Sequence, residues 1–238
     1  MSNEMNITID EARALVSDAA LWPHVRDFLW DFATQVHSSW LEGVGREPLD
    51  ESQEGNSGSS LVSSLSTSPR VKRFILSSLG VEPCFHTFPK DDWSRLALLD
   101  GATLESCAKW LGAIACADGL RRVTDGKTVR ELKAALPGVY PEVFGYTAYF
   151  TGFDLSAKDE KTATTPEGVV DAGLGLLFSL LGGCPASVVS RIKFKLPAPL
   201  VSRLPDSGHE TRDAGRVGAA VIKLLKLKFP EAYSLCCS

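Results

Sequence analysis

The spacing of apolar residues predicts a chain made almost entirely of helices. Apolar residues recur at intervals of three and four, which places them on one face of an α-helix. Leu104, Cys107, Ala108, Leu111 and Ala115 follow this spacing, and Trp110 and Ile114 widen the apolar face. The helices predicted from this pattern and from end signals cover residues 8–20, 22–43, 69–79, 104–115, 127–136, 141–149, 169–181, 185–194 and 211–228, and a further one begins at 91–92. No convincing pair of strands occurs, so the fold class we predict is all-α, a compact multi-helix globular domain.

Helix ends are marked by residues that satisfy or replace free backbone groups. Ser68-Pro69 and Thr165-Pro166-Glu167 are typical helix starts, and Thr8 with Glu11 has the spacing of a capping box. In the helix 69–79, Val71, Phe74, Ile75 and Leu79 fall on one face. Gly112 lies inside a predicted helix, where it costs about 1 kcal/mol relative to alanine unless close helix packing requires it.

Two polar stretches interrupt the helices and suggest how the chain is divided. Residues 45–67 are rich in serine, glycine and acidic residues, and 154–165 form a second polar connector. We therefore predict N-terminal helices over 1–44, a flexible linker or loop over 45–67, and a main helical body over 68–238. The sequence leaves open whether 1–44 pack on that body as one domain.

Composition excludes some functions without selecting one. The 25 basic and 29 acidic residues give a net charge of −4, so no overall attraction to nucleic acid or anionic membrane exists. The start, MSNEMNITIDEA, lacks the basic and apolar regions of a signal peptide. The apolar run 169–181 contains Asp171 and is too short to span a membrane. We therefore expect a cytosolic protein whose six cysteines are reduced.

The sequence contains several fragments of catalytic and metal-binding motifs, but none is complete. Gly126-Lys127-Thr128 resembles the end of a P-loop, yet Arg121 stands where the other glycine is required. Ser190 and Lys193 have a Ser-x-x-Lys spacing without its companion motifs. Cys84 and His86 lack the further ligands of a zinc site. We expect no enzyme activity, no cofactor and no metal site, and we interpret Cys236-Cys237 as part of an exposed C-terminal tail.

Two basic clusters are the remaining candidates for function. Each could bind an acidic partner or a lipid surface, or could simply be a solvated helix face. The first cluster consists of Arg121, Arg122, Lys127, Arg130 and Lys133. The second consists of Arg212, Arg216, Lys223, Lys226 and Lys228. As candidate interface residues we select Arg121, Arg122, Arg130, Lys133, Arg212, Arg216 and Lys223.

Several blocks of the chain resemble the SctK/YscK family of bacterial type III secretion proteins. The blocks, in order, are residues 95–99 (RLALL), 110–113 (WLGA), 120–126 (LRRVTDG), 129–132 (VREL), 134–136 (AAL) and 191–197 (RIKFKLP). The resemblance implies a non-enzymatic adaptor in the cytoplasmic sorting platform of the injectisome. Its partners would be an SctD-like inner-membrane ring protein, through its cytoplasmic domain, and an SctQ-like pod protein. The SctL/SctN stalk and ATPase would be contacted indirectly, with no nucleic acid bound and no direct insertion into the membrane.

Two other hypotheses stay open on the sequence alone. A helical type III secretion chaperone or regulator would bind a client peptide in an exposed apolar groove, and such proteins are usually small dimers. An enzyme could also assemble a site from dispersed residues, although no sequence pattern here supports one. Nucleotide binding or hydrolysis would count against the adaptor hypothesis.

Overall fold

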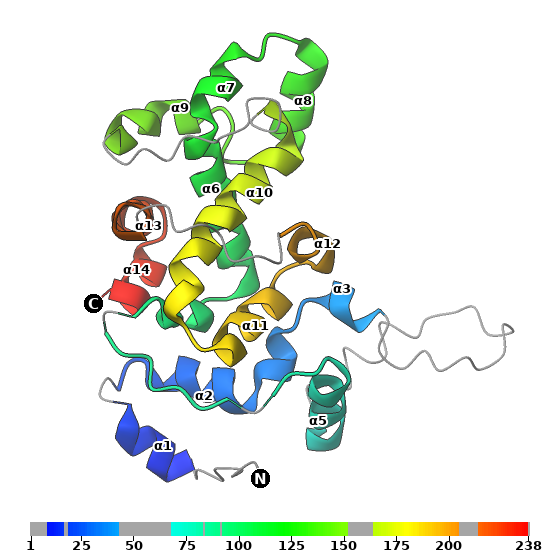
Figure 1. Cartoon of the computed structure of the whole chain (residues 1–238), viewed down its shortest axis with the longest axis vertical. Coiled ribbons are helices and arrows are strands. Elements are labelled where there is room, and N and C mark those ends of the chain that lie inside the picture. Colours follow the sequence, from blue (N-terminus) through cyan, green and yellow to red (C-terminus); the bar gives the residue numbers. More distant parts are fainter. Residues whose placement is uncertain are drawn as a thin grey trace, which may run out of the picture. The chain divides into compact units, whose positions relative to one another are not determined.

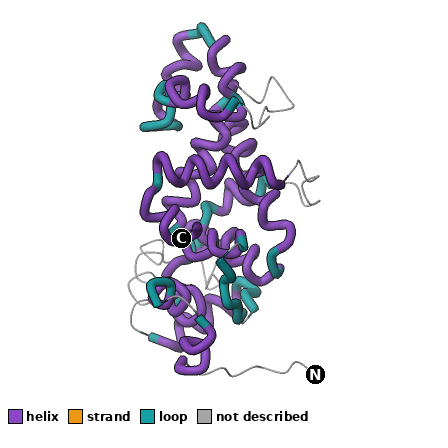
Figure 2. Tube along the Cα trace, turned by 90° about the vertical axis from the view of Figure 1, so that its left-hand side faces the viewer, coloured by secondary structure: helices purple, strands orange, loops and turns teal. Residues whose placement is uncertain are grey.

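The computed structural model of the chain confirms the all-α prediction. Every regular element in the described residues is a helix, either α or 3₁₀ (Figures 1 and 2). The described residues are 9–16, 19–42, 68–82, 84–90, 92–151, 164–204 and 214–237. The predicted linker 45–67 and most of the connector 154–165 lie outside these ranges. In the part of the chain that is described, no helix is long and apolar enough to cross a membrane.

The chain divides into two units, and each is built from separate stretches of sequence. Unit 1 comprises Met1–Asp100 and Pro185–Ala198, and unit 2 comprises Gly101–Cys184 and Pro199–Ser238. This division differs from the three-part organisation predicted from the polar stretches. The N-terminal helices share a unit with α11, because the backbone N–H of His37 donates to Phe194 O at 2.8 Å and the Trp40 indole donates to Leu196 O at 2.8 Å.

Unit 1 is built from short helices joined by irregular segments. Its elements are α1 (Ile9–Leu15), α2 (Trp22–Trp30), η1 (Phe32–Gln35), α3 (Ser38–Leu41), α5 (Pro69–Ser78), η2 (Trp93–Leu98) and α11 (Ala186–Lys195). Helix α1 ends at Leu15 rather than near Ala20. Helix α5 ends close to the predicted position, where Gly80 adopts a positive φ of 64°.

The predicted helix 22–43 is wrong, because three short helices replace it. Asp31 leaves the helical region after α2, and Val36 and His37 are extended. The extended backbone at His37 allows its N–H to bond Phe194 and its ring Nδ1 to accept from Ser39 N at 3.2 Å. These contacts compensate for the lost helical hydrogen bonds.

Only part of the apolar face predicted for the helix 69–79 is buried. Its side chain is 54% exposed, whereas Ile75 is 2% exposed. Helix α5 packs against η1, and Lys72 pairs with Asp31 at 2.5 Å. The contact with η1 thus buries Ile75 in unit 1, while Phe74 stays exposed.

Unit 2 contains the longer helices. Its elements are α6 (Gly101–Ala115), α7 (Ala117–Arg122), α8 (Gly126–Ala135), α9 (Val143–Tyr146), η3 (Thr147–Phe150), α10 (Pro166–Ser179), η5 (Leu180–Gly183), α13 (Ala214–Lys228) and α14 (Pro230–Cys237). A further short helix, α12 (Ala198–Val201), lies at the boundary of the two units in the stretch where prolines predicted irregular structure. Thr165 caps α10 as predicted, accepting from Gly168 N at 3.1 Å.

Helices α6 and α10 cross in contact at two glycines (Figure 1). A Cβ at Gly112 would lie 1.8 Å from Val169 O, and a Cβ at Gly173 would lie 1.8 Å from Ala108 O. Neither distance is possible for a side chain, so the backbones approach more closely than any other residue allows. Close helix packing is therefore the reason that a glycine stands at position 112, inside a helix.

The C-terminus is helical and partly buried, so its interpretation as an exposed tail is wrong. Helix α14 begins with Pro230 and Glu231. Both a proline and an acidic residue suit the first turn of a helix. This helix packs on α13, and its Cys236 is buried. Local sequence shows the start signal, but the burial depends on the neighbouring helix.

Candidate functional site

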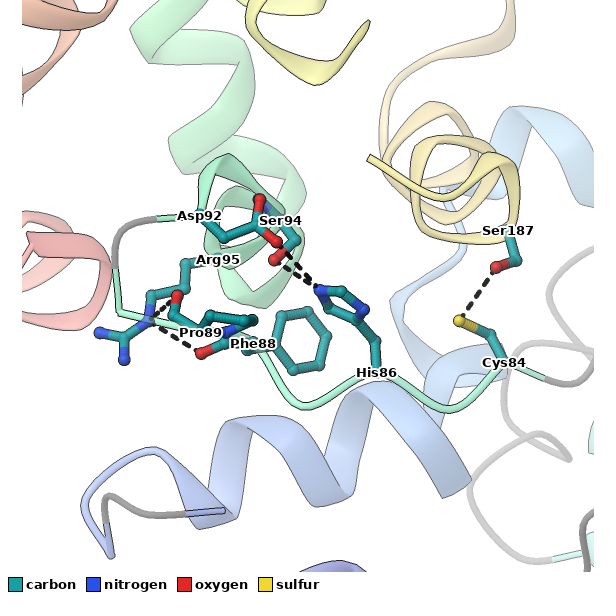
Figure 3. Close-up of polar contacts among 8 residues, drawn as sticks. All are labelled: Cys84, His86, Phe88, Pro89, Asp92, Ser94, Arg95 and Ser187. Carbon is teal, nitrogen blue, oxygen red and sulfur yellow. Dashed lines mark hydrogen bonds and ion pairs between the residues drawn. The ribbon is translucent and has the colours of Figure 1, made fainter. Parts of the chain in front are cut away.

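Three polar residues at the start of η2 form the cluster that most resembles a catalytic site (Figure 3). His86 Nε2 lies 2.8 Å from Ser94 Oγ and 3.3 Å from Asp92 Oδ2, and Ser94 N donates to Asp92 Oδ1 at 2.9 Å. Burial opposes ionisation of Asp92, but the hydrogen bonds from Ser94 and His86 outweigh it and lower the pKa of the carboxyl group.

The geometry of this cluster differs from a hydrolytic triad in two ways. In a triad, serine and carboxylate contact opposite nitrogens of the imidazole, whereas Ser94 and Asp92 both contact Nε2 of His86. The Ser94 side chain is also completely buried, so no substrate could reach it. The cluster instead fastens the segment 84–90 to the start of η2. Our sequence analysis missed it, although Asp92 two residues before Ser94 is a helix-capping signal.

Cys84 and His86, considered as metal ligands, contact different parts of unit 1. Ser187 Oγ of α11 donates to Cys84 Sγ at 3.1 Å, while His86 is directed towards Ser94 (Figure 3). Among the described residues, no group of three or more His, Cys, Asp and Glu side chains could hold a metal ion.

Arg191 and Lys195 of α11 are buried inside unit 1, each with 2% of its surface exposed. Lys195 Nζ donates to Ala97 O at 2.5 Å and to Leu99 O at 2.8 Å. The pKa of Lys195 is lowered to about 7, chiefly by burial; the charge of Asp100 opposes this effect and that of Arg191 adds to it. The ammonium group therefore links α11 to the end of η2.

Arg191 performs a similar structural role beside it. Its guanidinium donates to Phe28 O and, at 3.3 Å, to Glu82 O. Its central carbon lies 4.8 Å from the ring centroids of both Phe28 and Phe32. Burial lowers the pKa of Arg191. One side chain thus ties together α2, η1 and the segment after α5.

A sequence signal for these buried cations existed and was not used. Val188, Arg191, Ile192 and Lys195 are spaced at three and four, so the helix face that carries Val188 and Ile192 also carries two basic positions. We identified residues 191–197 only as a family-like block. Arg95 of η2 likewise donates to backbone carbonyls, because its Nε lies 3.1 Å from both Phe88 O and Pro89 O.

The basic residues of the first cluster lie on α7 and α8, and Arg121 has the most contacts described. Arg121 donates to Asp118 at 3.0 Å and to Thr147 Oγ1 at 2.6 Å, and it lies 5.6 Å from the Phe144 ring centroid. These contacts tie α7 to α9 and η3. The other candidates of this cluster, which are exposed on α7 and α8, are Arg122, Arg130 and Lys133.

The P-loop-like sequence forms the capped start of α8. Asp125 Oδ2 accepts from Thr128 N at 2.8 Å and from Thr128 Oγ1 at 2.8 Å. The hydrogen bond from the Thr128 backbone is the largest of the effects that lower the pKa of Asp125. The Asp125 carboxylate therefore already accepts from the backbone N–H that a bound phosphate would need.

The second basic cluster lies on α13, apart from Arg212, which is outside the described residues. Arg216 is exposed near the start of α13. Lys223 Nζ lies 5.9 Å from the Tyr149 ring centroid. Lys228 Nζ lies 4.0 Å from the ring centroid of Tyr146 and 3.4 Å from a carboxylate oxygen of Glu142.

The two basic clusters, distant in sequence, thus meet at one aromatic segment. Arg121 contacts Phe144 and Thr147, while Lys223 and Lys228 contact tyrosines of α9 and η3. The sequence did not predict this meeting. Arg121, Lys223 and Lys228 are therefore engaged within unit 2.

No protein-family model, curated protein or solved structure matches the chain. The resemblance to type III secretion proteins therefore rests on its sequence blocks. Two of these, residues 95–99 and 191–197, are joined through Lys195, and the block 110–113 contains Gly112 at the contact of α6 and α10.

Proposed function

We propose that the protein is a non-enzymatic structural adaptor of the bacterial type III secretion sorting platform. It links the cytoplasmic domain of an SctD-like inner-membrane ring protein to an SctQ-like pod protein, and reaches the SctL/SctN assembly indirectly. It acts in the bacterial cytoplasm, at the cytoplasmic face of the inner membrane.

The observation that carries the proposal is the position of the family-like blocks inside the fold. Blocks 95–99 and 191–197 lie far apart in sequence, yet Lys195 donates two hydrogen bonds between them. Block 110–113 supplies Gly112, where α6 touches α10. Residues that resemble the family thus serve packing rather than chemistry, which is what a scaffold requires.

Exposed charge on unit 2 supports an adaptor role in particular. Arg130 and Lys133 are exposed on α8, and Arg216 and Lys226 on α13. Charged faces of this kind increase association rates and favour contacts that can exchange. We therefore expect the α8 side of unit 2 to contact one of the two platform partners.

The proposal is tested by co-purifying the full chain separately with the ring protein's cytoplasmic domain and with the pod protein. The interface variant is Arg122→Glu, Arg130→Glu and Lys133→Glu together, which spares Arg121 because that residue ties α7 to η3. We expect the wild type to bind both partners, and the variant to lose at least about tenfold in affinity for one of them.

The control is Lys193→Glu, which reverses an exposed charge on α11 in unit 1. It should bind both partners as the wild type does, and circular dichroism should show all variants folded. Binding of the wild type to neither partner would reject the function. Full binding by the folded triple variant would reject the α8 side as the contact.

A further inference from the structure

The outer face of α13 combines positive charge with exposed apolar side chains. The helix contains four basic residues and no acidic one. Its inner face is buried in unit 2 through Val217, Val221, Leu224 and Leu225. Outside, Ile222 and Lys226 form one row at a spacing of four, and Lys223 and Leu227 form the neighbouring row.

Tyr149 of η3 extends this face. Lys223 Nζ lies 5.9 Å from its ring centroid, yet the tyrosine remains 54% exposed. Across the described residues, five large apolar or aromatic side chains are strongly exposed, and three of them are Tyr149, Ile222 and Leu227. Exposed apolar side chains are normal when scattered, but Ile222 and Leu227 share the outer face of one helix, and Tyr149 lies beside Lys223 of that helix.

Folding alone does not account for this surface. Basic residues in the last turn of a helix complement its dipole, which accounts for Lys226 and Lys228. Lys228 is also engaged with Glu142 and with the rings of Tyr146 and Trp110. Exposure of Ile222 and Leu227, by contrast, leaves apolar surface in water with no gain in stability for the isolated chain.

We propose that the outer face of α13, together with Tyr149, is a docking surface for an amphipathic helix of another protein, one whose apolar stripe is flanked by Asp and Glu. Its apolar stripe covers Ile222, Leu227 and the tyrosine ring. Its carboxylates lie against Arg216, Lys223 and Lys226. Tyrosine, arginine and aliphatic anchors with a charged rim are the usual composition of such an interface.

Charge decides between the possible occupants. A second copy of the chain, placed by twofold symmetry, would bring the basic side chains of α13 against themselves. A lipid surface recognised by charge commonly needs a cluster of roughly four to eight basic residues, and the apolar face of α13 is already used in the core. An acidic amphipathic helix matches both the positive charge and the small exposed apolar area of the outer face of α13. This inference does not depend on the type III secretion assignment.

The test uses the full chain and a fluorescently labelled synthetic helix with leucines at i, i+3, i+4 and i+7, flanked by glutamates. A matched peptide carries lysines in place of the glutamates. By fluorescence anisotropy at physiological salt, we expect the acidic peptide to bind at least about tenfold more tightly than the basic one. Leu227→Ser and Lys226→Glu should each weaken its binding by about tenfold.

Two matched controls separate a docking surface from general effects. Phe74→Ser removes a comparably exposed apolar side chain from α5, and Lys193→Glu reverses an exposed charge in the last turn of α11. Both should bind the acidic peptide as the wild type does. Circular dichroism melts should show that all four variants remain folded.

Three results would overturn the proposal. The first is equal binding of acidic and basic peptides, and the second is unchanged binding by Leu227→Ser and Lys226→Glu. The third is absence of peptide binding while vesicles containing phosphatidylserine bind the wild type and release the α13 variants, which would assign the surface to lipid. None of these results bears on co-purification with the ring and pod proteins, so the two proposals fail separately.

Discussion

Unit 1 and unit 2 differ in what lies at their centres. The buried polar and charged side chains of the described residues are Ser94, Arg95, Arg191 and Lys195, and all four belong to unit 1. In unit 2, the most extensive packing is the crossing of α6 and α10, where the closest approach is made by Gly112 and Gly173. Long cationic side chains are buried in the core of unit 1, whereas two glycines lie at the closest helix contact of unit 2.

The difference follows from helix length. In α6 and α10, nearly every carbonyl is bonded within its own helix, so the two backbones can touch without further donors. Unit 1 is built from short helices and irregular segments, and its buried carbonyls at Phe28, Ala97 and Leu99 accept from side chains. Long cationic side chains reach these carbonyls, because each offers several donors.

The largest effect is expected at the glycine contact of unit 2. Gly112→Ala would place a Cβ 1.8 Å from Val169 O, so α6 and α10 must separate. We expect the free energy of unfolding to fall by about 3 kcal/mol or more, measured by urea denaturation. Gly126→Ala is the control, because nothing lies within 4 Å of its Cβ position. Equal stability of the two variants would show that the close crossing is not required.

A smaller loss is expected when a donor is removed from the core of unit 1. Arg191→Met keeps an apolar stem but leaves the carbonyls of Phe28 and Glu82 without the guanidinium. We expect a destabilisation of about 2 kcal/mol. Arg203→Met, in unit 2, removes only a half-exposed pair with Asp171 at 2.9 Å. Arg203→Met should lower the free energy of unfolding by less than about 1 kcal/mol. Losses of equal size in the two variants would contradict the difference described between the two units.

The third prediction uses pH to detect the buried charge of Lys195. Its pKa is about 7 in the folded protein, against an ordinary value of 10.5. Between these values the unfolded chain binds the proton and the folded chain does not, so stability rises with pH in this window. Lys195 should contribute about 2 kcal/mol to the rise from pH 7 to pH 9.

This contribution is measured by urea denaturation at several pH values. Lys195→Met should lack that part of the rise, so the wild type gains stability relative to the variant as the pH increases. Lys193→Met, on the exposed side of the same helix, should follow the wild type. Parallel curves for Lys195→Met and the wild type would show that Lys195 keeps the same charge in both states.

The candidate site was only partly predictable from the sequence. The seven basic residues were selected by their clustering, but clustering does not show which side chains are engaged within the fold. Arg121 has its partners, Thr147 and Phe144, on η3 and α9. The His86 cluster and the exposed Tyr149 were missed, because neither forms a recognisable motif in sequence.

By itself, the sequence determined the helical nature of the protein and many helix ends, because helices depend on neighbours three and four residues apart. Thr165 caps α10 and Gly80 follows α5, both as expected from local signals. The tertiary structure alone decided the breaks between residues 22 and 43, the exposure of Phe74 and the burial of Lys195. Each of these depends on a partner distant in sequence, as when Phe194 accepts from His37, and no local pattern encodes that partner.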